Sequence, residues 1–322
     1  MGAETYNRTT PNRLLHFSYE HPIYPMFALF VIASLIKLLD TFVLPIQELV
    51  GELIVTKGLG FLLVVAYVWA CGKGLGAIGF HRRAAGKAIL IAVICVVSLY
   101  VLTYGAQLLA LWAAGTPAGL GLTAVDPHTG MTGGLAFGVW LVLANVVNSA
   151  MEEGLFRGAM LRHFRIRYAV WGAILLQAGF FAIWHLNWPI WKLYTGRSDL
   201  GAASLEAVIL LVSTGIAGIV YGWLYHKTDN LWAPFVAHMI NNSILNVLFI
   251  RTEGGLRSGT EFGLFVGLLV VGYLALIPLI ALLARWFQTP EVAPWGDGMA
   301  GVSVEMNIAR ASKRTLHDER DG

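Results

Sequence analysis

The chain has 322 residues, of which 57% are hydrophobic and only 13% are charged, and its formal net charge is +3. This composition lies outside the range of soluble proteins, and so small a charge argues against a nucleic-acid partner. Long apolar runs separated by short polar breaks instead predict an all-α, polytopic membrane helical bundle, because lipid requires every backbone polar group to be satisfied within a helix or a closed barrel.

Three regions follow from the order of polar and apolar stretches. Residues 1–25 are polar and aromatic and lack the apolar core of a cleaved signal, so we expect a cytoplasmic N-terminal segment. Residues 26–287 are predicted to form one transmembrane helical domain, with its functional core at about 130–250. Residues 288–322 are expected to form a poorly ordered, polar cytoplasmic tail with a short helix near 303–314.

About eight transmembrane helices of roughly 20 residues each are predicted. Their ranges are 26–44, 58–72, 87–114, 133–156, 169–188, 204–225, 231–250 and 262–287. Most of the 22 lysines and arginines fall on the side of the N-terminus, which predicts that both termini are cytoplasmic and suggests a bacterial inner membrane. The segment Thr116–Thr132, on the other side, has no basic residue and is rich in Gly, Pro and Thr, so we expect it to be flexible.

The most unusual apolar stretch reads NVVNSAMEEGLFRG and contains two adjacent glutamates and an arginine. A charge at bilayer depth costs at least about 2.5 kcal/mol, so these groups must be compensated or functional. Glu153 and Arg157 are four residues apart and can form an ion pair on one helix face. Glu152 points about 100° away and stays free, on the face that also carries Asn148.

Two further polar clusters lie in later spans. FAIWHLNW places Phe181 and His185 four residues apart, and FVAHMINN does the same for His238 and Asn242. Each pair therefore shares a helix face. Taken alone, the first cluster is also typical of an aromatic belt at the membrane surface, and the second of hydrogen bonds between helices.

The three polar clusters are expected to lie at a similar depth in the membrane. Glu152 and His185 are nearly equidistant in sequence from the basic turn at residues 165–168, so continuous helices would bring them to one height. His238 starts about 14 Å from the polar loop at residues 226–230, at 1.5 Å per residue. The three clusters are therefore predicted to meet in the cytoplasmic half of the membrane.

Such a meeting point suits the activation of water. A carboxylate with a histidine partner can take a proton from water, and a second histidine with an amide can donate hydrogen bonds to an oxygen that gains negative charge. Hydrolysis of a peptide bond needs these parts. No serine, cysteine or aspartate has a better claim to be the nucleophile, and Cys71 and Cys95 are interpreted as apolar packing residues.

The ordered set EExxxR, FxxxH and HxxxN, starting at Glu152, Phe181 and His238, resembles the CPBP family, also called ABI. That family comprises CAAX prenyl endopeptidases of the Ras-converting type, related bacterial proteases, and bacteriocin-processing or immunity proteins. The likeness covers about residues 130–250.

The resemblance implies an intramembrane glutamic endopeptidase, without a metal or other cofactor, that cuts near a terminus of a membrane-anchored or lipidated protein. Glu152 would be the general base assisted by His185, and His238 and Asn242 would hold the oxyanion. The supporting residues implied are the ion pair Glu153 and Arg157, the packing residue Phe181, and Asn148 on the face of Glu152.

Three other interpretations stay open. Glu152, His185 and His238 can supply three ligands of a catalytic zinc ion, although no HExxH helix is present. The chain can also be a non-proteolytic membrane scaffold or a bacteriocin-immunity protein, in which the polar residues serve packing alone. The third interpretation is a proton-coupled transporter, although this sequence lacks the broken-helix pairs typical of that class.

Overall fold

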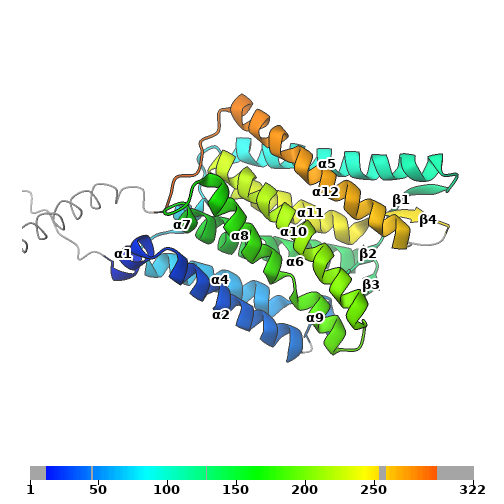
Figure 1. Cartoon of the computed structure of the whole chain (residues 1–322), viewed down its shortest axis with the longest axis horizontal. Helices are drawn as coiled ribbons and strands as arrows, with labels where there is room; N and C mark the ends of the chain where they lie inside the picture. Colours follow the sequence, from blue (N-terminus) through cyan, green and yellow to red (C-terminus); the bar gives the residue numbers. More distant parts are fainter. Residues whose placement is uncertain (1–11, 45, 128, 254–258, 296–322) are drawn as a thin grey trace, which may run out of the picture.

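Apolar helices that lie side by side along the long axis form the body of the molecule (Figure 1). The computed structural model describes residues 12–44, 46–127, 129–253 and 259–295. Within these residues, six helical segments are long and apolar enough to cross a membrane: Ile23–Phe42, Ala85–Ala113, Leu135–Phe164, Val170–Tyr194, Leu200–Thr228 and Phe262–Phe287. The predicted polytopic membrane bundle is therefore confirmed.

The predicted count of eight spans is not confirmed. The helices α4 (Ile54–Ala70) and α11 (Trp232–Val247) occupy the two other predicted ranges, but they have 17 and 16 residues. At 1.5 Å per residue such helices are about 25 Å long, which is shorter than the roughly 30 Å of a bilayer core.

The remaining helices and strands of the described residues are as follows. The helices are α1 (Arg13–Glu20), α2 (Ile23–Phe42), α3 (Ile46–Val50), η1 (Leu75–Ile78), α5 (Ala85–Ala113), α6 (Leu135–Glu152), η2 (Glu153–Leu161), α7 (Arg162–Phe164), α8 (Val170–Trp184), α9 (Asn187–Tyr194), α10 (Leu200–Thr228) and α12 (Gly259–Phe287). The strands are β1 (Ala118–Leu122), β2 (Ala124–Val125), β3 (Thr132–Gly133) and β4 (Leu248–Thr252).

Two buried clusters hold the bundle together. One joins α2, α4, η2 and α8 around Phe156, and the other joins α5, α10, α11 and α12 around Leu99. Because lipid tails are as apolar as the side chains, close packing rather than removal from water stabilises these contacts. Met151, near the end of α6, belongs to the first cluster, and Ala237, on α11, belongs to the second.

The fourth span does not end at residue 156 as predicted, but continues to Phe164. Its middle part, η2, is a π-helix, a form that often marks functional sites. The predicted end was wrong because the charge of Arg157 suggests a boundary, whereas this side chain is fully buried and paired with Glu153.

The segment predicted to be flexible, 116–132, contains two short strands. β1 pairs antiparallel with β4, and β2 pairs with β3. The side-chain amide of Asn246 also donates to the carbonyl of Val125 at 3.0 Å. The prediction did not include these contacts because β4 and Asn246 lie more than 100 residues away along the chain, although β3 follows β2 closely. β4 likewise ends the seventh helix before the predicted residue 250.

The first residues of the C-terminal tail pack against the bundle. Val292 and Trp295 are buried, and the Trp295 ring stacks on His163 at 4.6 Å between centroids. The expectation of poor order is therefore wrong for residues 288–295, while the helix expected near 303–314 lies outside the described residues. Both ends of the described chain lie at the same end of the bundle (Figure 1).

Candidate functional site

Two adjacent carboxylates flank one imidazole at the junction of α6, η2 and α11. The Nδ1 atom of His238 lies 2.7 Å from Oε1 of Glu153, and its Nε2 atom lies 3.6 Å from Oε2 of Glu152. All three side chains are buried. Because a carboxylate oxygen only accepts, the His238 Nδ1–H donates to Glu153, and Nε2 is directed toward Glu152.

Arg157 forms the predicted ion pair inside this cluster. Its Nη1 atom lies 3.0 Å from Oε1 of Glu153, and both side chains have no exposed surface. The guanidinium also lies 4.1 Å from the ring centroid of Phe181 and 5.4 Å from that of Tyr221. Glu153 is thus engaged by a cation and an imidazole N–H, and these contacts fix the ring of His238.

Glu152 keeps one oxygen without a hydrogen bond. Its Oε1 atom accepts from the indole N–H of Trp184 at 2.9 Å. Its Oε2 atom is buried and has no hydrogen-bond partner among the described residues. Oε2 is therefore the carboxylate atom that remains for a reacting group.

His185 lies at the C-terminal end of α8. Its Nδ1 atom donates to the carbonyl of Phe181 at 2.8 Å, so Nε2 carries the lone pair when the ring is neutral. The Phe181 and His185 rings meet edge to face with centroids 4.7 Å apart. Glu152 and His185 interact electrostatically, but no hydrogen bond or ion pair joins them within the part of the chain that the structure describes.

Asn242 is half-buried and lies one turn after His238. Its side-chain oxygen accepts from the amide of Asn241 at 3.2 Å, which leaves its own N–H groups for a ligand. Asn241 is itself held by the hydroxyls of Tyr100 and Tyr273, each 2.8 Å from its oxygen. Asn148 is half-buried on α6, one turn before Glu152.

Sequence reasoning missed three neighbours of this cluster: Lys37, Trp184 and Tyr221. The Tyr221 ring stacks on His238 at 5.4 Å between centroids. The Lys37 ammonium lies 4.1 Å from the Trp184 ring centroid. A lysine inside an apolar span was a usable signal for Lys37, but nothing in the sequence relates it to α8.

Glu152, His185 and His238 do not form a metal-ligand set in the structure. Across residues 12–44, 46–127, 129–253 and 259–295, no group of three or more His, Cys, Asp or Glu side chains is arranged to hold a metal ion. Glu152 and His238 instead make the carboxylate–imidazole contact described above.

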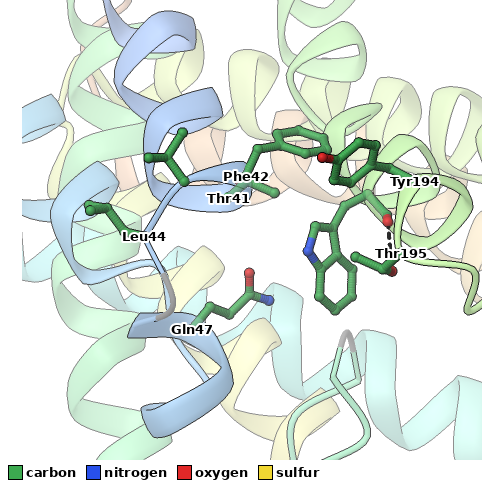
Figure 2. A pocket seen from close by; sticks show the side chains of 8 residues that line it. Thr41, Phe42, Leu44, Gln47, Tyr194 and Thr195 are labelled. Atoms are coloured by element: carbon green, nitrogen blue, oxygen red, sulfur yellow. Dashed lines mark hydrogen bonds between the residues drawn. The ribbon is translucent and has the colours of Figure 1, made fainter.

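A separate hollow of about 180 Å³ lies at the C-terminal end of α2 (Figure 2). Thr41, Phe42, Val43, Leu44 and Gln47 line it from one side, and Trp191, Tyr194 and Thr195 from the other. It contains none of the predicted site residues, so the hollow and the carboxylate cluster are distinct features.

Comparison with known families found a match to the part of the chain that carries this cluster. A family model described as type II CAAX prenyl endopeptidase Rce1-like matches residues 134–244. Residues 134–244 are therefore similar to Rce1-like CAAX prenyl endopeptidases, which supports the resemblance to the CPBP family. Comparison with curated proteins found no match.

The Rce1-like segment, residues 134–244, contains the side chains that meet at the junction of α6, η2 and α11. Glu152, His185, His238 and Asn242 all lie within it. Lys37 lies outside, on α2. The Rce1-like segment therefore supplies the predicted polar residues, while a helix beyond it supplies a cation beside them.

Proposed function

We propose that this chain is an intramembrane endopeptidase in which Glu152 activates a water molecule for attack on a peptide bond. The observation that carries the proposal is the buried Oε2 atom of Glu152, which has no hydrogen-bond partner in the described part of the chain and lies 3.6 Å from Nε2 of His238. The match of residues 134–244 to a CAAX protease family model supports the same reaction class.

In the first step, Glu152 takes a proton from water, and the oxygen of that water bonds to the carbonyl carbon. His185 assists as a second acceptor through Nε2, since its Nδ1–H is committed to Phe181. General-base assistance of this kind contributes typically about 10²–10⁴-fold to the rate. The carbonyl π electrons move to oxygen and create an oxyanion.

His238 and Asn242 stabilise this oxyanion. The proton accepted by Glu152 passes to Nε2 of His238, so the imidazolium donates from Nε2 to the oxyanion and from Nδ1 to Glu153. The Asn242 N–H supplies a second donor. The oxyanion then collapses, the C–N bond breaks, and the proton goes to the departing amine.

The substrate class follows from the membrane setting and the family. A buried site between membrane helices suits a membrane-anchored or lipidated protein that is cut near a terminus. We place the chain in a bacterial inner membrane with both termini cytoplasmic. The two described chain ends lie at the same end of the bundle (Figure 1), which supports their placement on one side of the membrane.

Comparative proteomics of protein termini tests this proposal. Cells that carry Glu152→Gln in place of the parent chain are expected to accumulate uncut membrane-anchored precursors, while the parent strain shows the shortened products. The accumulated precursors would identify the substrate. Identical termini in the two strains would overturn the proposed proteolysis.

Metal removal separates glutamate catalysis from zinc catalysis. With the substrate in hand, membranes treated with a strong chelator are expected to retain the full cleavage rate, because water activation is assigned to Glu152 and His185. Loss of the rate on chelation, with recovery on added zinc, would instead favour the zinc site formed by Glu152, His185 and His238.

A further inference from the structure

Lys37 is a buried cation at bilayer depth that the proposed reaction does not yet use. Its side chain is 5% exposed, on a helix outside the Rce1-like segment. Its ammonium donates to the carbonyl of Trp184 at 2.8 Å and lies over the Trp184 ring. Since that carbonyl belongs to the last turn of α8, the lysine also satisfies a helix end that has partial negative charge.

Trp184 links this lysine to Glu152. The carbonyl and ring of Trp184 contact Lys37, and its indole N–H donates to Oε1 of Glu152 at 2.9 Å. The position of the indole therefore depends on α2, and the position of the Glu152 carboxylate depends on the indole.

The ion pairs of the other buried cations give a second, independent link between Lys37 and Glu152. The buried lysines and arginines among the described residues are Lys37, Lys57, Arg157 and Arg162. Lys57 pairs with Glu52, Arg157 with Glu153, and Arg162 with Asp229. Lys37 has no carboxylate within ion-pair distance in the described chain, and Glu152 has no lysine or arginine there.

One other carboxylate competes for Lys37. Asp40 lies three residues later on the same helix and is fully buried. However, its Oδ2 atom accepts from the backbone N–H of Thr56 at 2.7 Å and from the Thr56 hydroxyl at 2.8 Å. One oxygen of Asp40 is thus used at the start of α4, and its Oδ1 atom has no hydrogen-bond partner among the described residues. Glu152, in contrast, lies next to the indole that Lys37 covers.

We propose that Lys37 is a positioning residue for Glu152: it supplies the buried counter-charge of this carboxylate and fixes the indole that orients it. With both imidazoles neutral, the charges of Lys37 and Arg157 balance those of Glu152 and Glu153. Glu152 can then remain an anion without a charged histidine in the resting site. The role in catalysis rests on the proposed function of Glu152, whereas the charge pairing does not.

A double-mutant cycle on the purified full chain tests the pairing without any substrate. We expect Lys37→Met to lower the Tm clearly in the parent background and much less in the Glu152→Gln background, because that change removes the charge that Lys37 balances. Equal losses in both backgrounds would overturn the proposal, as would a coupling that appears with Asp40→Asn instead. Lys192→Met, at the more exposed pair with Glu206, is the matched control.

If Lys37→Met alone cannot be purified, recovery of folded protein in the Lys37→Met/Glu152→Gln double variant supports the pairing, and failure of both variants overturns it. Once a substrate is known, kcat should fall at least tenfold in Lys37→Met with KM unchanged, and Lys37→Arg should recover part of the loss. Thermal coupling without a change in kcat would refute the positioning role alone. If the parent chain cleaved no substrate, the proposed function would be refuted, but the charge pairing would remain.

Discussion

Glu152→Gln is expected to lower kcat by about 10²–10⁴-fold, the usual contribution of a general base. Glutamine has nearly the same shape as glutamate, and its amide oxygen can still accept from Trp184 N–H, which lies 2.9 Å from Oε1 in the parent. The variant therefore loses the base while the surrounding packing is preserved. Single-turnover cleavage in reconstituted bilayers measures the loss of the chemical step directly.

Glu206→Gln is the matched control for this experiment. Glu206 lies on α10 and pairs with Lys192 at 2.8 Å, and both side chains are partly exposed. Its replacement should leave kcat unchanged. If Glu152→Gln retained the parental cleavage rate, Glu152 would not be the base, and another residue would have to activate the water.

The apolar helices were predictable because their signal is local. Lipid forces each spanning segment to satisfy its own backbone hydrogen bonds, so a run of apolar residues is sufficient to indicate a helix. The prediction of an end at residue 156 was wrong for the same reason. Arg157 and Glu153 neutralise each other inside the bundle, and although their spacing predicts the ion pair, the predicted end of the span treated Arg157 as a boundary charge.

The motif spacing predicted which polar residues face inward, but not their contacts across helices. Spacing of four residues places two side chains on one face of their own helix. It gives no information on how α11 approaches α6. The structure shows that His238 contacts both glutamates, with its shorter contact to Glu153, whereas the resemblance suggests Glu153 only as a partner of Arg157.

Long-range pairs were the features that sequence reasoning missed. Strand β1 finds its partner β4 far along the chain, and Lys37 contacts Trp184 across 147 residues. Trp295 reaches His163 from the tail. Each contact joins segments whose own composition suggests a loop, a broken span or a polar tail, so no local pattern indicates the partner.

Arg157→Ala is expected to destabilise the folded protein by about 3–5 kcal/mol, the typical cost of removing one partner from a buried ion pair. Glu153 would keep a buried negative charge with no cation at 3.0 Å. The alanine would also leave space beside Phe181, whose ring the guanidinium covers at 4.1 Å. Thermal unfolding in detergent, together with the yield of monodisperse protein, measures this loss.

The double variant Arg157→Ala/Glu153→Gln separates the charge from the cavity. If the stranded carboxylate causes the loss, Glu153→Gln should recover a large part of the Tm even though the cavity remains. If packing against Phe181 causes it, the double variant should be as unstable as Arg157→Ala. Lys192→Ala, which breaks a partly exposed pair, should cost only about 0–1 kcal/mol. A fully stable Arg157→Ala variant would show that Glu153 is not an isolated buried charge without Arg157, and His238 would then have to be the group that compensates it.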